Sequence, residues 1–568
     1  MKKFESFIAA ILADKKKKFL VLLLTLIAFG ASIMMLPTKT VLARMLPGKS
    51  ANTYSVYVDT PVGSSINETE KVTQCIVEHL KKESEITDME IYLGMGSPLD
   101  YAGLVKGSAF KRNEHEAEIV VNLTDKHGRS EASFEMIQRI RPAIKQECEA
   151  IKEGTVIKLI EQPAGPPTLA SVVIELYSND TEGLRSLSVK LAKILKETDG
   201  LVDVDVMQDE TYKTYQLIPN QEKIIKSGLS LTQVNQILYL AFEGMDVAIK
   251  NSANSPDQIP LFVTLSKQTK SIHQMDKTAL RNKLSSLKLM NQKGMMVPIT
   301  EVVTIQEAPS NPMIMTKNLR QFVNIIAETD MVSQVYPLLD AREQIKEQLS
   351  NEYDIESTKL FNYRLTDKKT GAVYDLVWDG EMKVTMDTFA DLGAAFIAAL
   401  ILIFLLLVIY YKSFVLSGIV LLGSFLSIVG VIVGHWIVDQ FTVHTFFLTA
   451  TSLIGFIALM GISSRNSLLL IDFTKSLMLA KGMEKQRAIA IATATRAKPI
   501  FLTAAAIILA STLLAADPIF GGLGVALIFG TIAAVIVSLV FIPVLMDNSD
   551  LEKHFQFEEH PYLLLPIL

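Results

Sequence analysis

Arg465 lies near the middle of an apolar run at residues 445–473 that is long enough to cross a membrane as a helix. An arginine at the centre of such a helix costs about 2.5 to 3.5 kcal/mol on insertion scales, so an ionisable side chain there indicates a functional site. Asn466 follows it directly, and Thr503 lies in another apolar run. Amides and hydroxyls in such runs either serve a site or hydrogen-bond to neighbouring helices. Arg465 itself predicts a proton relay or a charge partner within the membrane.

The apolar runs hold no carboxylate at mid-span that could pair with Arg465. Removing one partner of a buried ion pair costs about 3 to 5 kcal/mol, because it leaves an uncompensated charge. We therefore expect the anionic partner to come from outside these residues. The alternative is that Arg465 snorkels to the membrane surface, since only about eight residues separate it from Phe473. The nearby aspartates fall at the ends of runs or in connections: Asp391, Asp439, Asp472 and Asp517.

The motifs predict no enzyme chemistry and no cofactor. The sequence has no phosphate-binding glycine loop, which excludes ATP as the energy source and leaves an ion gradient. Its eight histidines show neither an HExxH motif nor a paired metal spacing, so no metal site is predicted. Four methionines offer thioethers to a soft metal, but methionine more often fills gaps in apolar cores. They are Met295, Met296, Met313 and Met315.

The two cysteines, Cys75 and Cys148, cannot form a disulfide framework or a CxxC metal site. Both fall on predicted helices that pack on one sheet. We expect two buried free thiols, although an outer compartment would permit one bridge.

The composition predicts a chain that is part membrane and part aqueous. Hydrophobic residues make up 49% and charged residues 20%, and the mean hydropathy is +0.31. With 55 basic and 60 acidic residues and no long basic block, nucleic acid is excluded as a partner. About six apolar runs are long enough to span a bilayer, and about 350 hydrophilic residues separate the first from the second. The runs are 19–36, 389–411, 414–438, 445–473, 499–516 and 522–546.

Basic residues near the ends of the runs predict the orientation. The positive-inside rule places both termini in the cytoplasm and residues 37–387 outside. The first run could instead be a signal peptide, but no clear A-x-A site follows it. The basic residues that decide the orientation are Lys2, Lys3, Lys15 to Lys18, Lys412, Lys475, Lys481, Lys485, Arg487, Arg496 and Lys498.

The outer block predicts two copies of a split βαβ module, each with the order βαββαβ. The first covers 37–165, and its first helix begins at a Ser65–Glu68 capping box. The second covers 166–387 and is interrupted by an inserted module at about 213–310. The predicted fold class is a membrane α-helical bundle of six transmembrane helices with a large periplasmic α+β region of ferredoxin-like split βαβ modules. The remaining parts are 1–36 with the first span, the five-helix region 388–546 and a cytoplasmic tail at 547–568.

This organisation resembles the carboxy-terminal half of a resistance-nodulation-division (RND) efflux transporter. The family's Gly-x-Ser-x-Lys-Asn pattern is matched at Gly461, Ser463, Arg465 and Asn466, and its Arg-Pro-Ile-x-x-Thr pattern at Pro499, Ile500 and Thr503. Arg465 stands where most drug exporters have lysine, and Lys498 where arginine is usual. Further matches are LP at 46–47, PAGPPTLA at 163–170, KIIKSGLSLTQVNQ at 223–236, GMMVPITEV at 294–302, GISSRNSLLLIDF at 461–473 and RAKPIFLT at 496–503.

The resemblance implies a proton antiporter subunit in the bacterial inner membrane that exports small molecules. Arg465, Asn466 and Thr503 would form the proton relay, facing two aspartates on the fourth helix of a separate amino-terminal half. The family assembles as trimers, with a funnel that the insertion at 213–310 would supply, and works with a periplasmic adaptor and an outer-membrane channel. Membrane lipid surrounds the helices.

Two other functions remain compatible with the sequence. One is a Sec-type protein-export motor, which also has six helices and a large outer domain after the first. The other is an inactive or scaffold remnant of a split transporter. The cargo class also stays open among drugs, lipids and metals.

Overall fold

The structure is a computed structural model that describes most of the chain. The described residues are 2–48, 50–126, 128–161, 165, 167–208, 211–254, 258–266, 277–330, 335–359, 361–442 and 444–555. They form two units, one of Met1–Met207 with Met315–Leu568 and one of Gln208–Ile314. The end of the predicted tail, 556–568, lies outside the described residues.

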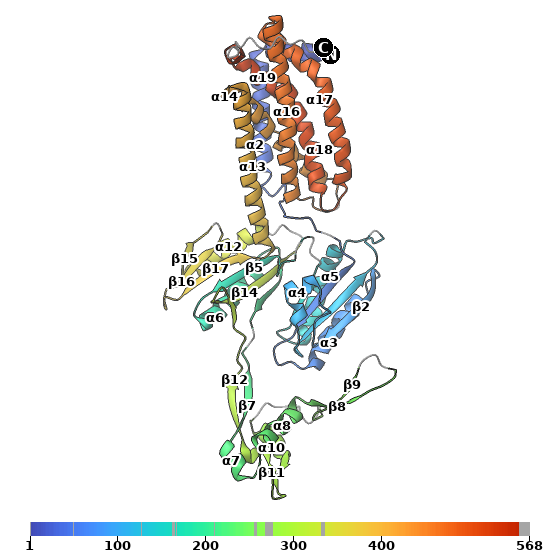
Figure 1. Cartoon of the computed structure of the whole chain (residues 1–568), viewed down its shortest axis with the longest axis vertical. Helices are drawn as coiled ribbons and strands as arrows, with labels where there is room; N and C mark the ends of the chain where they lie inside the picture. The colour runs from blue at the N-terminus through green and yellow to red at the C-terminus, as the bar shows by residue number, and fades with distance from the viewer. Residues whose placement is uncertain are drawn as a thin grey trace. The chain divides into compact units, whose positions relative to one another are not determined.

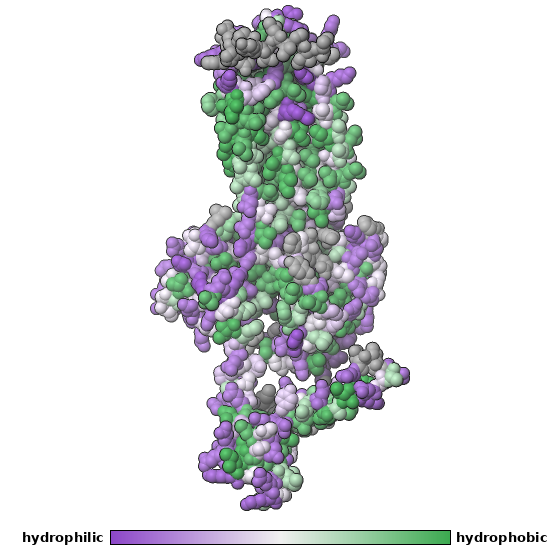
Figure 2. All heavy atoms as spheres, viewed as in Figure 1, coloured by the Kyte–Doolittle hydropathy of each residue, from purple (hydrophilic) through white to green (hydrophobic). Residues whose placement is uncertain are grey.

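Six stretches of the described residues are helical, long and apolar enough to cross a membrane. Apolar side chains cover the visible face of these helices as a band (Figure 2). Together with the mixed α/β region, they confirm the predicted fold class. The stretches are α2 (Lys15–Met34), α13 (Glu381–Tyr411), α14 with α15 (Phe414–Phe425, Ile428–Asp439), α16 (Ala450–Lys481), α17 (Lys485–Ala515), and α18 with α19 (Gly521–Ile536, Ile542–Asn548).

Local signals set the ends of α16, the helix that carries Arg465. Thr449 caps its start with a capping box that includes Ser452, and its end is followed by Gly482 in the left-handed conformation at φ +57°. The helix continues well beyond the apolar run that ends at Phe473, because Lys475 and Lys481 are good helix formers and their charges suit a helix carboxy-terminus.

An amphipathic helix that the sequence analysis did not predict, α1 (Lys2–Leu12), precedes the first span. It buries Ile8, Ile11 and Leu12 in a core shared with α17. The Gln486 side chain of α17 donates a hydrogen bond to the Leu12 carbonyl at 3.3 Å. This contact holds α1 against α17, which Figure 1 labels among the helices of the bundle.

The first α/β module is a four-stranded antiparallel sheet in the order β2-β3-β1-β4, the order of a split βαβ fold. Two helices, α3 and α5, pack on one face of the sheet and share its apolar core. A short helix, α4 (Tyr101–Lys106), lies in the connection before β3. The other bounds are β1 (Thr53–Asp59), α3 (Ile66–Leu80), β2 (Ile86–Leu93), β3 (Glu116–Leu123), α5 (Ser133–Cys148) and β4 (Val156–Ile160).

The structure corrects the expectation of two free thiols. Cys75 of α3 and Cys148 at the end of α5 form a disulfide, with their Cα atoms 5.7 Å apart. The two helices pack against each other over the sheet, which brings the thiols together. Their helices are predictable from the apolar pattern, whereas the rotation of one helix relative to the other is not.

The second module is built on a seven-stranded antiparallel sheet. Six of its strands follow the order β13-β14-β5-β17-β16-β15, and β6 pairs with β14. The chain leaves after β6 and returns at β13 and β14. Strand β5 lies between β14 and β17. Strand β17 belongs to a terminal three-stranded meander, which the sequence analysis did not predict. The bounds are β5 (Val172–Tyr177), α6 (Thr181–Lys196), β6 (Leu201–Met207), β13 (Met315–Lys317), β14 (Arg320–Thr329), α12 (Val335–Leu349), β15 (Tyr353–Ser357), β16 (Tyr363–Asp367) and β17 (Val373–Asp379).

The unit of Gln208–Ile314 is an antiparallel ribbon of β7 and β12 that leads to a small helical core. A separate hairpin of β8 and β9 exposes all of its residues, including the apolar Val247, Ile249, Leu261 and Phe262. The bounds are β7 (Lys213–Pro219), α7 (Gln221–Lys226), α8 (Leu231–Phe242), β8 (Met245–Lys250), β9 (Ile259–Val263), α10 (Lys277–Ser285), β10 (Lys288–Met290), β11 (Met296–Pro298), α11 (Ile299–Val302) and β12 (Val303–Pro309).

Candidate functional site

Arg465 lies on the outward face of α16. Ala458, Gly461, Arg465 and Leu469 are all exposed and follow one another at spacings of three and four residues, so they share one side of the helix. A Cβ atom added at Gly461 would meet nothing within 4 Å. The surface one turn before Arg465 is therefore open to another helix.

Arg465 has no hydrogen-bonding or ionic partner within the part of the chain that the structure describes. A guanidinium carries five N–H donors and keeps its charge at any physiological pH. In the membrane-spanning part of α16, the described residues therefore leave this positive charge uncompensated.

Among the described residues, no hydrogen bond or ion pair joins the three predicted relay residues. Asn466 is buried, on a different side of α16 from Arg465. Thr503 is exposed on α17, and its hydroxyl donates to the carbonyl oxygens of Pro499 and Ile500 at 3.1 and 3.0 Å. Thr503 therefore bonds its own helix, close to the proline that interrupts the backbone hydrogen bonds of α17.

Buried hydroxyls join α16 to α14 on the side away from Arg465. The Ser464 hydroxyl lies 2.8 Å from that of Ser424 in α14 and donates to the Met460 carbonyl at 2.7 Å. Ser463 is fully buried. These small residues fix the inner face of α16 and leave the Arg465 face outward.

A carboxylate that the sequence analysis passed over lies two turns beyond Arg465. Asp472 accepts a hydrogen bond from the Tyr411 hydroxyl at 3.1 Å and another from the Tyr410 hydroxyl at 3.2 Å. Tyr411 also bonds the Leu468 carbonyl at 3.3 Å. The signal in the sequence was the seven-residue spacing from Arg465, which places Asp472 on the same face of α16.

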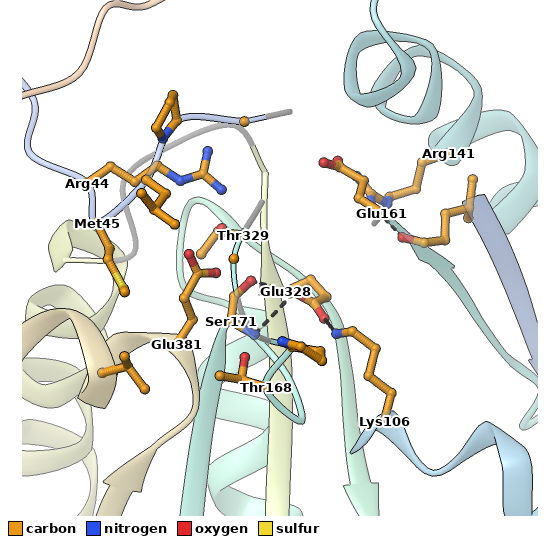
Figure 3. A pocket seen from close by; sticks show the side chains of 17 residues that line it. Arg44, Met45, Lys106, Arg141, Glu161, Thr168, Ser171, Glu328, Thr329 and Glu381 are labelled. Atoms are coloured by element: carbon orange, nitrogen blue, oxygen red, sulfur yellow. Dashed lines mark hydrogen bonds and ion pairs between the residues drawn. The ribbon is translucent and has the colours of Figure 1, made fainter. Parts of the chain in front are cut away.

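A second candidate site is a cavity of about 240 Å³ in the larger unit. Its walls come from the segment after α2, from both α/β modules and from the first turn of α13. Figure 3 shows Arg44 on one side of the cavity and Glu161 beside Arg141 on the other. The remaining charged residues of the lining are Lys106, Glu328 and Glu381.

The carboxylate of Glu328, in the wall of this cavity, is held by an ion pair and by hydrogen bonds. Lys106 lies 2.9 Å from it, and both the backbone N–H and the hydroxyl of Ser171 donate to it. Burial opposes its ionisation, but Lys106 and the Ser171 donors outweigh that effect and hold the pKa of Glu328 below its usual value. This pair joins the first module to the second.

Glu161 has no hydrogen bond or ion pair with a described residue. Burial raises the pKa of Glu161 to about 7, although Arg141 and Arg44 oppose the rise. Arg141 is engaged elsewhere, with Asp203 and Asp330 each at 3.4 Å. Arg44 has a buried Nε without an acceptor in the described chain and lies over the Phe447 ring. Arg44 and Glu161 therefore offer a free donor and a titratable carboxyl to a bound molecule.

Two of the sequence motifs meet at this cavity. Leu46 and Pro47 of the LP motif line it, as do Gly165, Pro167 and Thr168 of PAGPPTLA. A Cβ atom at Gly165 would lie 2.8 Å from Leu46, so glycine permits the close approach of the two motifs. The motif residues Pro163, Ala164 and Pro166 lie outside the described residues.

One group of metal-ligand types occurs together in the described chain, and it is Cys75, His79 and Cys148. The disulfide engages both sulfur atoms, and His79 lies 3.0 Å from Glu147. Of the four methionines weighed as soft-metal ligands, three lie exposed in the smaller unit and one lies in β13 of the larger: Met295, Met296, Met313 and Met315.

Comparison with known proteins gives a consistent answer. A sequence model of the AcrB/AcrD/AcrF family matches residues 1–547. The swarming motility protein SwrC of Bacillus subtilis (strain 168) is 24% identical over 385 residues, which are 66% of this chain and 32% of SwrC. The multidrug export protein AcrF of Escherichia coli (strain K12) is 22% identical over 513 residues, which are 88% of this chain and 45% of AcrF.

A solved structure shares the fold. The X-ray crystal structure of a heavy metal efflux pump superposes with a TM-score of 0.71 at 17% identity and covers 96% of this chain and 52% of that chain. The chain therefore spans about half the length of that pump, and less than half of each curated relative is matched.

Proposed function

The chain belongs to the AcrB/AcrD/AcrF family of RND transporters, and we propose that it is the carboxy-terminal half of a proton-driven efflux permease that works with a separate amino-terminal half. The observation that carries the proposal is Arg465, an exposed cation on a membrane-spanning helix without a partner in the described chain. An unpaired charge facing lipid is costly, whereas a carboxylate on a facing helix would compensate it.

The partner half would supply paired carboxylates opposite Arg465. While they are ionised, the guanidinium attracts them and holds the two halves in one arrangement. When protons bind, that attraction is lost and the helices can shift, which would move the α/β modules between access states. Asn466 and Thr503 are proposed as further polar groups of the relay. Thr503 would have to exchange its bonds to Pro499 and Ile500 to take part.

The cargo would be a small molecule held in the cavity of Figure 3. The lining combines apolar Met45, Leu46 and Pro47 with the free donor of Arg44 and the titratable Glu161. AcrF is named for multidrug export, and the similar crystal structure is a heavy metal pump. A soft metal needs several thiolate or thioether ligands, whereas this lining contains one thioether among the described residues. The chemistry therefore favours an organic molecule.

Assembly and location follow from the same proposal. We place the chain in the bacterial inner membrane with residues 37–387 in the periplasm, because the basic residues at the ends of the spans gather on the other side. We also propose that the parts of the chain end at residues 36, 165, 387 and 546, as predicted from the sequence. We propose a trimer, as the family resemblance implies, and the exposed apolar hairpin of β8 and β9 supports association between copies of the chain. A periplasmic adaptor and an outer-membrane channel would complete the pump.

Affinity purification of the chain from its native membrane tests the proposal. We expect a membrane protein with six spans and two carboxylates on its fourth span to co-elute in a one-to-one ratio. Arg465→Ala should leave the chain in the membrane and its assembly with the partner largely intact, so that a loss of export by this variant reports on the charge. Elution of the chain without such a partner, as a Sec-type motor or a remnant would elute, contradicts the proposal.

A further inference from the structure

Asp472 is the acidic side chain on the Arg465 face of α16 whose surroundings the proposed function leaves unexplained. Its two carboxylate oxygens are held separately, Oδ1 by the Tyr411 hydroxyl at 3.1 Å and Oδ2 by the Tyr410 hydroxyl at 3.2 Å. Both tyrosines come from the last turn of α13. A carboxylate that receives two hydroxyl donors from a neighbouring helix has a fixed position and orientation.

Asp472 lies nearer than Arg465 to the carboxy-terminal end of α16. Seven residues separate Arg465 from Asp472, which corresponds to about 10 Å along the helix axis and nearly the same direction around it. Leu469 lies between them on that face. Asp472 is half-buried, so part of its side chain stays open on the Arg465 face of α16.

The charged groups around Asp472 differ from those at Arg465. Lys475 follows on α16, Lys412 directly follows the tyrosines, and Arg496 of α17 lies over the ring of Phe473. Among the described residues, no ion pair within 4.0 Å joins Asp472 to Lys412 or Arg496. The hydrogen-bond donors that hold the carboxylate in the described chain are thus the two neutral tyrosine hydroxyls.

We propose that Asp472 is the station through which protons leave the Arg465 centre toward the end of the bundle that carries Lys412 and Lys481. This inference rests on the proposed function and extends it. A proton passes, by way of water, from a carboxylic acid of the partner half to an oxygen of the Asp472 carboxylate. The donor becomes a carboxylate again beside Arg465, and Asp472 becomes a carboxylic acid. Asp472 then releases the proton to water and returns to its ionised form.

Tyr410 and Tyr411 act as positioning residues in this step. While Asp472 is ionised, both hydroxyls donate to it. When one oxygen carries the proton, the hydroxyl bound to that oxygen must give up its bond or accept instead. Tyr410 is largely exposed, whereas Tyr411 is buried and its hydroxyl also bonds the Leu468 carbonyl.

The test measures proton entry into liposomes that contain the chain with its co-purified partner half and an entrapped pH-sensitive dye. Ethidium is the probe cargo, and a pH gradient is imposed. We expect Asp472→Asn to slow proton entry about tenfold or more, because an amide cannot carry the proton. Asp472→Glu should restore part of the rate. Tyr411→Phe should slow proton entry less than Asp472→Asn, with complex assembly unchanged.

The matched control is Asp391→Asn, which makes the same chemical change at an exposed aspartate of α13 and should leave the rate unchanged. If Asp472→Asn fails to assemble, the comparison of Tyr410→Phe with Tyr411→Phe decides instead, since both keep the ring and the carboxylate. A wild-type rate for Asp472→Asn, or for both phenylalanine variants in that case, overturns the inference. If Arg465→Ala is inactive in the same assay, the proposed function still stands; if Arg465→Ala is also fully active, both are wrong.

Discussion

Arg465 is the residue on which the transport proposal depends. We expect Arg465→Ala to abolish proton-driven export, because no other cation of the described chain lies at that depth on the open face of α16. Arg465→Lys should keep part of the activity, since lysine retains the charge but loses the planar donor fork. Export of ethidium under an imposed pH gradient, with the partner half present, measures both.

Thr503→Ala is the matched comparison for Arg465→Ala. It removes a hydroxyl that bonds only its own helix backbone in this structure, so its effect should be several-fold smaller than that of Arg465→Ala. Full activity of Arg465→Ala would mean that the guanidinium merely snorkels to the surface.

Glu161 gives a prediction about pH. Its pKa is raised from 4.5 to about 7, so the folded protein binds a proton that the unfolded chain has released between these values. The free energy of unfolding should therefore fall as the pH rises from about 4.5 to about 7, and the loss is complete above that. Glu161→Gln removes this dependence.

Thermal unfolding in detergent at several pH values measures the difference. The variant should melt above the wild type at pH 8, and the gap should narrow toward pH 5. Glu149→Gln, which changes a part-exposed carboxylate at the end of α5, is the control. A gap that does not change with pH would contradict the raised pKa.

The sequence predicts a functional residue where a side chain is chemically unusual for its surroundings. It misses a residue whose role depends on partners that only the fold brings close. Arg465 was found because an arginine in an apolar run is costly wherever the helix packs. Asp472 was taken for a solvated residue at a span end, since its tyrosines lie about 60 residues earlier in the chain. Arg44 and Glu161 gave no signal, because neither is unusual until the segment after α2 and the end of β4 meet at the cavity.

At the scale of elements, the disulfide between α3 and α5 gives the clearest prediction. It closes a loop of 73 residues, for which the chain-entropy estimate is about 4 kcal/mol. Replacing both cysteines by serine should therefore lower the melting temperature of the first module. The same fall should follow reduction of the wild type by a dithiol.

The serine variant also serves as the control for the reductant. It has no disulfide, so the reductant should not change its melting temperature. Equal melting of the wild type with and without reductant would show that the two cysteines are not paired. Thiol labelling of the denatured, unreduced protein checks the same point directly and should find no free thiol in the wild type.

Elements were predictable where an apolar pattern repeats over many residues. The strands and helices of the first module follow from alternation and from the Ser65 capping box, and the structure has them in the predicted order. The meander β15, β16 and β17 was missed, because three short strands without a helix between them show little periodicity. The helix α1 was missed because its charged start reads as the flank of the first span.

At the scale of the whole molecule, the orientation in the membrane is a prediction that labelling can test. Lys481→Cys lies at the exposed end of α16, and Lys193→Cys lies on the exposed face of α6. The native cysteines are paired and should not react. An impermeant thiol reagent added outside intact cells, after the outer membrane is permeabilised, should label Lys193→Cys and leave Lys481→Cys unlabelled. Labelling of both from outside would contradict the six-span arrangement.

The central claim is that this chain needs a carboxylate-bearing partner half to move protons. The most direct test is proton entry into liposomes under an imposed pH gradient, with ethidium as the probe cargo, for the chain alone and for the chain with its partner half. We predict no entry above empty liposomes for the chain alone, rapid entry with the partner half, and loss of that entry with Arg465→Ala. Cargo-dependent proton entry through the purified chain alone would contradict the account.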